Sequence, residues 1–434
     1  MSEIQYDAKQ LEAIRLCCDK SKRIVAITGE AGTGKTTIIK EVYKRLYSER
    51  KILNSDGSVK AIIPDCIVVA PTGKAAKRIQ EVTGIPAITL HRLLEYPMPG
   101  EVDEETGKPT TNYGPKRDRY NPIDARIVIC DEYAMVNREL HNNLIFALPP
   151  GGIVRMFGDC NQLEPIEEGI IVKGQESAYV SILKKFPSVI LDQIHRQTEE
   201  SSIISNAHLI NQGIFPKRTP DFRLIFTSQQ VQPTDELLKI IENDNDFYTY
   251  KKQVLSPTKT RWVGTEKLNN IVQSKRFQNS TAIGVPIERH PWCKLPLQLF
   301  VGDKVIIGKN NYDLGIFNGE TGTVKEVYPY GNVIIDFGDR IVTIPTEIVT
   351  CYRGKWYTYN PQRDIDLAYV ITTHKAQGSE YEDVIYMMDK AIIYNESRKN
   401  LYTAITRAKK KVTIITDQRS LMYSLATKTG MYNK

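Results

Sequence analysis

The chain has 434 residues, about three times the commonest domain size of roughly 150 residues, so we expect two or three folded units. Hydrophobic residues make up 41% and charged residues 25%, which is typical of a soluble globular protein and excludes disordered, collagen-like and coiled-coil classes. The net charge of +7 suits a nucleic-acid partner, although solubility alone could explain it.

The cysteine pattern and the apolar runs bear on the compartment. The seven cysteines are scattered and form no C-x-x-C pair, which argues against a disulfide framework or a zinc cluster and favours a reducing compartment. No run approaches the roughly 18 apolar residues of a membrane span, and the first five residues show no export signal. We therefore expect an intracellular protein without a membrane partner.

Short β-branched runs recur along the chain, and each leads into turn residues or a helical pattern. The first group comprises Ile24–Thr28, Ile67–Ala70, Ile127–Cys130 and Ile153–Phe157. The second group comprises Gln253–Ser256, Leu367–Ile371, Val384–Met387 and Val412–Ile415. Near-continuous apolar strands separated by helical stretches are typical of a parallel sheet covered on both faces, so two α/β domains are predicted.

Two stretches interrupt this pattern. Residues 95–126 are polar and rich in Pro and Gly, with no helical period. Between about 291 and 360, short runs alternate with Gly and Asn turns, at Lys304–Ile307, Gly322–Val324, Val333–Asp336 and Ile341–Thr343. Closely spaced strands with tight turns predict a small antiparallel barrel inserted in the second α/β domain.

The strongest motif is GEAGTGKT at residues 29–36, which fits G-x-x-x-x-G-K-[ST] and lies between an apolar strand and a helical run. Its glycines let the backbone N–H groups and a helix N-terminus face phosphates. Lys35 would bridge the β- and γ-phosphates, and Thr36 would ligate Mg²⁺. The alternative is a glycine-rich turn, which would match by chance in roughly one or two chains per hundred before its context is required. The predicted nucleotide-binding residues here are Gly29, Gly32, Thr33, Gly34, Lys35, Thr36 and Thr37.

Polar side chains follow two later strands. Asp131 and Glu132 end the run at 127–130, at the sheet edge where ligands bind in open α/β proteins. Asp131 can hold Mg²⁺ and Glu132 can polarise an attacking water, whereas such a pair standing alone is more often a solvated cap. Gln162 follows the next strand and could sense the γ-phosphate, or could mark a simple turn.

Hydrolysis also requires positive charge on the departing phosphate. Arg196 and Arg407 are candidates, and each could equally be a surface arginine. The residue pattern alone does not choose between these roles.

Three basic clusters follow apolar strands, and a folded sheet would present them on one side. They are Lys74, Lys77 and Arg78, then Lys259 and Arg261 beside Trp262, then His374 and Lys375. Cations that track a backbone, together with aromatic contacts, are what single-stranded nucleic acid requires. Solvated helix starts are the alternative interpretation.

The ordered motifs resemble those of superfamily 1 DNA helicases, in the RecD-like branch that includes the phage Dda helicase, over nearly the whole chain. The phosphate loop and Asp131–Glu132 match motifs I and II, and Gly158–Asp159 with Gln162 matches motif III. The remaining matches are Ala70–Ala76, Thr89–His91, Leu191–Gln197, Thr372–Glu380 and Leu401–Ala408. Val301–Gly322 is similar to the Src-homology-3-like barrel that this branch inserts in its second motor domain.

The resemblance implies an α/β fold with two RecA-like motor domains of the P-loop NTPase class, a small pin-type insertion in the first and a Src-homology-3-like β-barrel in the second. The expected bounds are 1–94 with 127–195 for domain 1, 95–126 for its insertion, 196–290 with 361–434 for domain 2, and 291–360 for the barrel.

The implied activity is an ATP- and Mg²⁺-dependent DNA helicase that moves 5′ to 3′ on single-stranded DNA and unwinds duplex at junctions. The alternatives are a DNA-stimulated ATPase that remodels protein–DNA complexes and a small-molecule kinase, which would leave the second domain unexplained. The resemblance favours a monomer in the cytoplasm of a bacterium or phage-infected cell, working with single-strand-binding, replication or recombination proteins.

The resemblance also assigns roles to residues. Gln10 would read the adenine, Gly378 and Glu380 would bind nucleotide with Glu380 on the ribose, and Arg196 and Arg407 would be arginine fingers. The implied DNA contacts are Pro71, Thr72, Lys74, His91, Thr258, Lys259, Thr373, His374 and Lys375.

This chain departs from the family pattern at three places. Glu164 stands where many relatives have Pro, and Ala134 replaces a frequent Ser. The 95–126 segment occupies the position of the strand-separating pin without an evident aromatic-tipped hairpin, so Tyr96 and Tyr113 are candidate wedges in what is otherwise an exposed loop.

Overall fold

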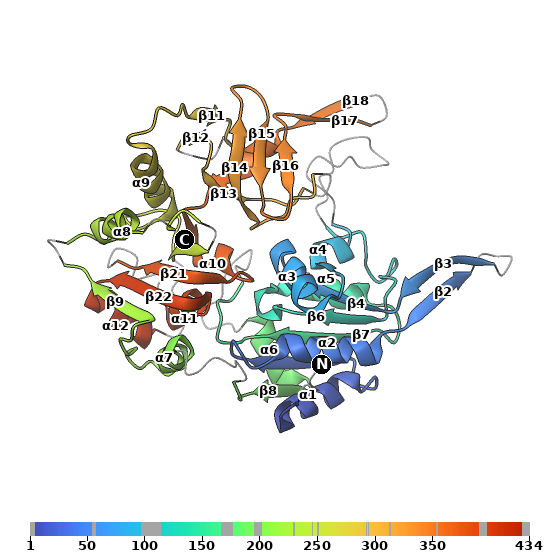
Figure 1. The fold of residues 1–434 in the computed structure, drawn as a ribbon. Coiled ribbons are helices and arrows are strands. Elements are labelled where there is room, and N and C mark those ends of the chain that lie inside the picture. Colours follow the sequence, from blue (N-terminus) through green and yellow to red (C-terminus); the bar gives the residue numbers. More distant parts are fainter. Residues whose placement is uncertain are drawn as a thin grey trace. The chain divides into compact units, whose positions relative to one another are not determined.

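The computed structural model describes residues 5–53, 58–96, 114–165, 177–194, 202–228, 231–244, 246–249, 251–291, 293, 295–311, 314–352, 355–389 and 397–427. Within these residues the chain divides into two compact units, of which the first ends by residue 198 and the second begins at residue 199. Each unit has its own parallel sheet (Figure 1). No helix among the described residues is long and apolar enough to span a membrane.

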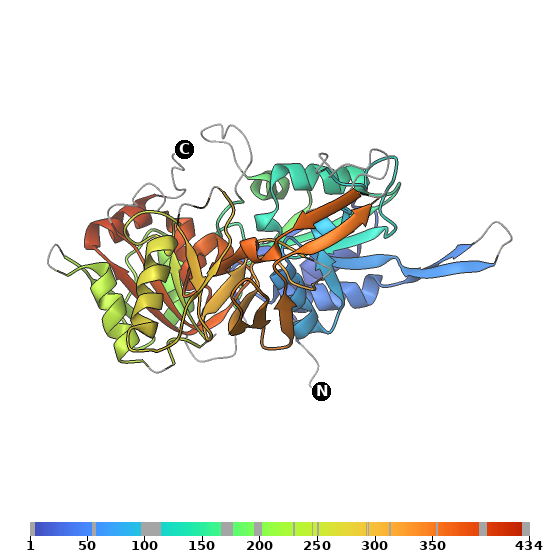
Figure 2. The same ribbon diagram turned by 90° about the horizontal axis from the view of Figure 1, so that it is seen from above.

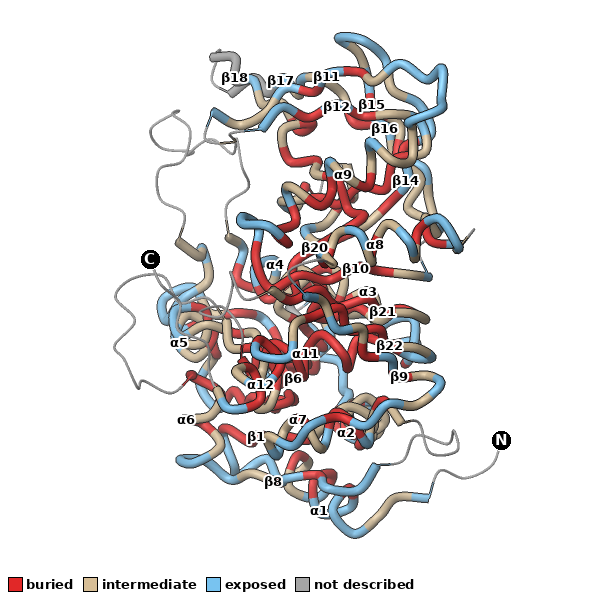
Figure 3. Tube along the Cα trace, turned by 90° about the vertical axis from the view of Figure 1, so that its left-hand side faces the viewer, coloured by how far each residue is buried: buried red, intermediate tan, exposed pale blue. Residues whose placement is uncertain are grey.

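The first unit is built on a six-stranded parallel sheet in the order β5-β4-β6-β7-β1-β8. Its strands are β1 (Ile24–Gly29), β4 (Cys66–Ala70), β5 (Ala87–Thr89), β6 (Ile127–Cys130), β7 (Ile153–Gly158) and β8 (Ser188–Leu191). Every residue of β1, β6 and β7 is buried, and Figure 3 shows β1 and β6 in red. The predicted parallel sheet is therefore confirmed.

Helices cover both faces of this sheet. They are α1 (Ala8–Cys18), α2 (Lys35–Leu46), α3 (Gly73–Thr83), α4 (Leu90–Leu93), η1 (Tyr133–Met135), α5 (Arg138–Ala147) and α6 (Ala178–Lys185). In β1, Val25 and Ile27 join one core with helices α1 to α3, whereas Ala26 joins the other core with α5 and α6. This alternation follows from the two-residue period of a strand, and it explains why the run is apolar at every position.

An antiparallel hairpin, β2 (Glu49–Leu53) and β3 (Val59–Pro64), interrupts the first unit between α2 and β4. The sequence pattern does not predict this hairpin. Figures 1 and 2 show it extending away from the parallel sheet. Its base is held where the Asp65 N–H donates to the Ser48 carbonyl at 2.8 Å and where the Asp65 carboxylate accepts hydrogen bonds from Nε and Nη2 of Arg126.

The second unit contains a five-stranded parallel sheet in the order β20-β10-β21-β22-β9. Its strands are β9 (Phe222–Phe226), β10 (Lys252–Ser256), β20 (Val370–Thr372), β21 (Tyr381–Met387) and β22 (Ala408–Thr416). One face packs on α7 (Ser202–Asn211), α11 (Arg398–Ile405) and α12 (Gln418–Ala426), and the other on α8 (Pro233–Glu242) and α9 (Thr265–Phe277). The short α10 (Thr373–Ala376) follows β20. The second predicted α/β domain is thus also present.

An antiparallel sheet belongs to the same unit, in the order β16-β15-β14-β13-β19. Its strands are β13 (Lys304–Ile307), β14 (Thr321–Val327), β15 (Val333–Asp336), β16 (Ile341–Ile344) and β19 (Ile365–Leu367). Around it lie the pairs β11 (Val285–Ile287) with β12 (Leu297–Leu299) and β17 (Ile348–Tyr352) with β18 (Lys355–Tyr359), and the 3₁₀ helix η2 (Pro361–Asp364). Its Src-homology-3-like character and the pin role of 95–126 remain predictions.

The single strand predicted at Leu367–Ile371 is wrong. The run divides between β19, which pairs antiparallel with β13, and β20, which pairs parallel with β10. The Asn269 side-chain amide donates to the carbonyls of Leu367 and Val370 at 3.2 and 2.8 Å and so holds the chain as it passes from one sheet to the other. These partners are distant in sequence, which is why a local hydrophobic run could not reveal the break.

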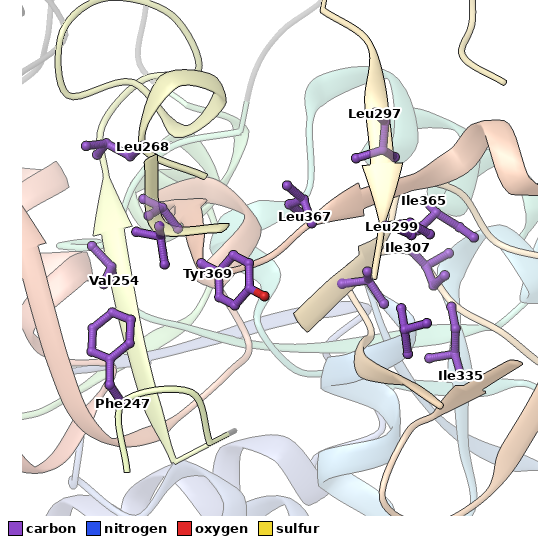
Figure 4. Close-up of a cluster of buried hydrophobic side chains, with 14 of the residues drawn as sticks. Phe247, Val254, Leu268, Leu297, Leu299, Ile307, Ile335, Ile365, Leu367 and Tyr369 are labelled. Atoms are coloured by element: carbon purple, nitrogen blue, oxygen red, sulfur yellow. The ribbon is translucent and has the colours of Figure 1, made fainter. Parts of the chain in front are cut away.

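One hydrophobic cluster joins the two sheets of the second unit. It extends from Val254 and Leu268 beside the parallel sheet, past Leu367 and Tyr369, to Ile307 and other residues of the antiparallel sheet (Figure 4). Because the core is continuous, the antiparallel sheet is packed onto the parallel sheet as part of one folded unit.

Candidate nucleotide and nucleic-acid sites

The phosphate loop connects β1 to α2 through glycines that no other residue could replace without strain. Gly32 and Gly34 have φ angles of 89° and 83°, in the left-handed region that favours glycine. A Cβ at Gly34 would lie 2.5 Å from Gln10 Nε2, and a Cβ at Gly29 would lie 2.5 Å from Thr33 Oγ1. The chain therefore curls tightly, as the motif predicts.

The first turn of α2 carries Lys35, Thr36 and Thr37, all half-buried. Lys35 Nζ donates to the carbonyl oxygens of Gly29 at 2.7 Å and Glu30 at 2.9 Å, so the ammonium lies over the loop. Gly34, the N-cap of α2, has no side chain with which to cap the helix. The N–H groups of the first turn and the Lys35 charge are thus arranged for an anion.

Gln10 reaches this loop from α1. Its Nε2 donates to the Thr33 carbonyl at 3.1 Å, and its Oε1 accepts from the Asp7 N–H at 3.1 Å, completing a capping box. Both ends of the amide are engaged in the structure, which binds the start of α1 to the loop. The adenine-reading role stays a prediction.

Asp131 and Glu132 follow β6 as expected. Asp131 is buried, and Glu132 adopts a left-handed φ of 50° while its N–H donates to Asp131 Oδ1 at 2.8 Å. Burial, with the Glu132 charge, raises the pKa of Asp131 to about 6, while the charges of Lys35 and Arg78 act in the opposite direction. Asp131 therefore lies within electrostatic reach of the phosphate-loop lysine, and Glu132 is the next residue in the chain.

Two buried acceptors at this edge have no hydrogen-bond donor among the described residues. They are Glu132 Oε2 and Gln162 Oε1. Gln162 is buried, and its Nε2 lies 3.5 Å from Asp159 Oδ2. Because an unsatisfied buried acceptor costs about 1–3 kcal/mol, such atoms favour a ligand or water that completes them. These two oxygen atoms fit the water ligands of a hydrated Mg²⁺, which donate hydrogen bonds.

The turn after β7 is tied to the phosphate loop by residues that sequence analysis missed. Asn161 Nδ2 donates to Glu30 Oε1 at 3.1 Å, and the Cys160 N–H donates to Thr28 Oγ1 at 3.3 Å. Glu30 occupies a variable position of the motif, so no sequence signal pointed to it. The contacts mean that the turn carrying Gln162 is positioned directly by the loop that would hold phosphate.

In the second unit, Arg407 is buried and therefore does not have the surface role left open above. Its guanidinium donates to the carbonyls of Thr403 at 3.1 Å and Ser379 at 3.4 Å. Ser379 lies between Gly378, whose φ is 72°, and Glu380, which forms a 3.2 Å ion pair with Lys409. The motif segments Thr372–Glu380 and Leu401–Ala408 are thus in contact within the second unit. Arg196 lies outside the described residues.

The predicted DNA-contact residues of the first unit lie after the carboxyl ends of neighbouring strands. Strands β4 and β5 pair in parallel with Ala70 opposite Thr89, which brings the segment after each to the same edge. That edge carries Pro71, the N-cap Thr72 and Lys74 on one side and His91 on the other.

The Tyr96 side chain, a candidate strand-separating wedge, is held by contacts within the first unit. Its hydroxyl accepts a 2.7 Å hydrogen bond from Asn143 Nδ2, and its ring packs against His91 at 4.9 Å between centroids. The other candidate wedge, Tyr113, lies outside the described residues.

The DNA candidates of the second unit also share one edge. Strands β10 and β20 pair with Ser256 opposite Thr372, and Thr373 Oγ1 donates to the Ser256 carbonyl at 3.4 Å. Thr258 is buried and Lys259 exposed after β10, while His374 and Lys375 belong to α10 after β20. Burial lowers the pKa of Lys375, and the nearby Lys259 charge also lowers it. Two of the predicted basic clusters are thus adjacent.

Comparisons with known proteins agree with this arrangement. A family model described as an AAA domain matches residues 5–221, and one described as a UvrD-like helicase C-terminal domain matches residues 367–415. The chain is 30% identical to the ATP-dependent RecD2 DNA helicase of Deinococcus radiodurans, over 89% of this chain and 46% of that protein. It is 25% identical to the RecBCD enzyme subunit RecD of Buchnera aphidicola, over 93% and 72% of the two chains. The chain thus spans about half the length of the first of these relatives.

Solved structures of Pif1 helicases share the fold. A Bacteroides Pif1 helicase in complex with ADP-AlF3 and ssDNA is 21% identical with a TM-score of 0.56, covering 100% of this chain and 95% of that one. The Pif1 helicase of Candida albicans is 20% identical with a TM-score of 0.53, covering 97% and 96%. At these identities the similarity concerns the fold alone, and it identifies both parallel sheets as RecA-like.

Proposed function

This chain belongs to the RecD-like branch of the superfamily 1 helicases, and we propose that it is an ATP-dependent DNA helicase that moves 5′ to 3′ along single-stranded DNA and unwinds duplex. The observation that carries the proposal is the meeting of Lys35, Asp131 and Glu132 at one sheet edge, where Glu132 Oε2 is buried without a donor among the described residues. A glycine-rich turn without a binding function would not bring a lysine and two acids together at one sheet edge.

The first unit would bind and hydrolyse the nucleotide. The phosphates of ATP would lie against Lys35 and the first-turn N–H groups of α2. Thr36 and Asp131 would hold Mg²⁺, which supplies positive charge to the phosphates when bound. Glu132 would orient the attacking water and accept its proton, and Gln162 would hydrogen-bond near the γ-phosphate.

The second unit contributes further residues to the proposal. Arg407 keeps the role that the family resemblance implies, stabilising charge on the departing phosphate, as does Arg196. The carbonyls of Thr403 and Ser379 hold the Arg407 guanidinium in one orientation, which is what electrostatic stabilisation of a transition state requires. Glu380 and Gly378 are proposed to contact the nucleotide.

The single strand would follow the sheet edges that carry the basic clusters. In the first unit these residues are Thr72, Lys74 and His91, and in the second Lys259, His374 and Lys375. Their cations would contact phosphates, so affinity should fall as salt concentration rises. The 30% identical relative is named as an ATP-dependent DNA helicase, which supports DNA as the polymer.

The first experiment measures ATP hydrolysis with and without single-stranded DNA, for wild type, Lys35→Ala and Glu132→Gln. Lys40→Ala, which removes an exposed lysine from the same helix, is the matched control. We expect DNA to stimulate hydrolysis in wild type and in the control, and both site variants to lose it. A rate that DNA does not change would refute the motor function, whereas activity that survives Lys35→Ala would refute the site.

A second experiment tests the direction of movement along DNA and whether the chain separates duplex strands. Duplexes with a 5′ or a 3′ single-stranded tail are offered with ATP, and strand separation is followed. We expect unwinding from the 5′ tail. Unwinding from the 3′ tail alone would refute the direction, and DNA-stimulated hydrolysis without unwinding of either substrate would favour remodelling of protein–DNA complexes.

A further inference from the structure

A tryptophan is displayed on the surface of the loop between β10 and α9. Trp262 is 65% exposed, although Val263 beside it is buried in the core. Large aromatic side chains bury more apolar area than any others and dominate interface energetics, so an indole held in solvent is a candidate contact for a ligand. Thr258 and Lys259, both predicted DNA contacts, precede it in the same loop.

The loop that carries Trp262 is firmly built. The N–H of Thr265 donates to the Thr258 carbonyl at 3.1 Å, and the N–H of Glu266 donates to the Lys259 carbonyl at 3.0 Å, which closes the loop at its base. Ser256 Oγ donates to the Val263 carbonyl at 2.6 Å. The exposure of the indole is therefore a fixed feature of the fold.

The backbone on either side of Trp262 is also constrained. Arg261 adopts a left-handed φ of 82°, which non-glycine residues rarely do. At Gly264 an added Cβ would lie 2.2 Å from the Thr260 carbonyl oxygen, so only glycine fits. Backbone strain of this kind persists where the surrounding structure over-determines it, often at ligand-binding loops.

A cation lies against the indole. Lys267 Nζ is 3.6 Å from the centroid of the Trp262 ring, a cation–π arrangement. Despite this contact, Trp262 remains 65% exposed. The pair therefore offers an exposed aromatic side chain with a positive charge over one face of its ring.

The position of this pair in the second unit indicates its ligand. The loop leaves β10 at Ser256, which is paired with Thr372 of β20 and accepts from Thr373 Oγ1. The Lys259 charge also acts on Lys375 across this edge. Trp262 thus belongs to the same edge as the predicted phosphate contacts of the second unit.

We propose that Trp262 stacks on a base of single-stranded DNA through the ring face opposite the Lys267 ammonium. The proposal rests on the function proposed above and adds a contact to the base where the other predicted contacts are to the backbone. Proteins that hold single strands without sequence preference combine basic side chains along the backbone with aromatic stacking, and this edge supplies Lys259, Lys375 and the Trp262 ring. A protein partner seated on the indole would be the other occupant.

The test compares two single strands of equal length, oligo-dT and an abasic strand with the same number of phosphates, by fluorescence anisotropy. Trp262→Ala should weaken oligo-dT binding roughly 5- to 100-fold, the usual effect of losing one stacking contact, and leave abasic binding within about twofold. Trp262→Phe keeps a stacking ring and should restore most of the affinity. Ile283→Ala, which removes another apolar side chain that is 86% exposed, is the control and should bind both strands like wild type.

The outcomes separate this inference from the proposed function. If Trp262→Ala binds oligo-dT like wild type, or loses both strands equally, the stacking role is refuted while the helicase function stands. A wild-type chain that binds neither strand would instead refute the function on which the inference rests.

Discussion

The side-chain amide of Gln10, in α1, donates to the carbonyl oxygen of Thr33 at 3.1 Å, although the rest of α1 and all of β1 lie between the two residues in sequence. This bond, together with the capping box at Asp7, makes Gln10 part of the phosphate loop's support. Replacing Gln10 with Ala should destabilise the first unit by about 1–3 kcal/mol and weaken nucleotide binding. Urea unfolding and titration with a fluorescent ATP analogue measure the two effects.

Asp7→Ala is the control for Gln10. It removes the helix cap, which costs about 1 kcal/mol, but leaves the bond from Gln10 to Thr33. Nucleotide affinity should therefore stay closer to wild type than in Gln10→Ala. Equal affinities in wild type and Gln10→Ala would contradict the supporting role.

Glu132→Gln should separate binding from hydrolysis. The amide has nearly the shape of the carboxylate but cannot accept a proton, so the hydrolysis rate should fall about 10²–10⁴-fold while the nucleotide still binds. Single-turnover hydrolysis and equilibrium binding of ATP measure the two quantities. Glu139→Gln changes an exposed acid in the first turn of α5 and should behave like wild type. A parallel loss of binding and hydrolysis in Glu132→Gln would argue against a role for Glu132 in the chemical step.

Arg407 should matter for both stability and rate. Because its guanidinium is the donor to the Thr403 and Ser379 carbonyls, Arg407→Ala should cost the second unit about 1–3 kcal/mol and abolish DNA-stimulated hydrolysis. Arg407→Lys keeps the charge but cannot reproduce the planar set of donors, so it should remain stable enough to purify and still hydrolyse slowly. Thermal unfolding and steady-state rates are the measurements. Wild-type hydrolysis in both variants would show that the arginine has no catalytic part.

The Asp65–Arg126 pair predicts a pH dependence of stability. Hydrogen bonds from Arg126 hold the pKa of Asp65 below its usual value, so the carboxylate binds protons less readily in the folded chain than in the unfolded one. Its stabilisation is therefore present at neutral pH and is lost as the pH falls through the lowered pKa. Asp65→Asn should cost about 1 kcal/mol near pH 7, with the difference from wild type shrinking below about pH 4. Urea unfolding at several pH values measures it, and a constant difference down to pH 3 would contradict the pair's contribution.

The strands that sequence analysis predicted best are those that local chemistry specifies. The runs at 127–130, 304–307 and 333–336 coincide with β6, β13 and β15. A short apolar run bounded by turn residues is sufficient to predict a buried strand. The hairpin at 49–64 was missed because its strands mix charged and apolar residues and have few buried positions. The run at 367–371 predicts one strand because its division depends on Asn269, which is distant in sequence.

The nucleotide site shows the same division. The motif at 29–36 predicts a strand, a loop and a helix, since glycine and lysine at those spacings have few other uses. The bonds from Asn161 to Glu30 and from Gln10 to Thr33 have no signal of their own, because each joins residues whose types are common anywhere in a protein.

Composition, periodicity and motif spacing thus account for the two parallel sheets and for the residues that would bind phosphate, because these depend on short segments of chain. Three features required the folded chain: the burial of Arg407 among carbonyls, the unsatisfied Glu132 oxygen, and the exposure of Trp262 on a constrained loop. Burial and hydrogen-bond partners come from segments that are distant in sequence and meet only when the core forms. A residue type can suggest a role, but its surroundings in the folded chain decide whether it can perform that role.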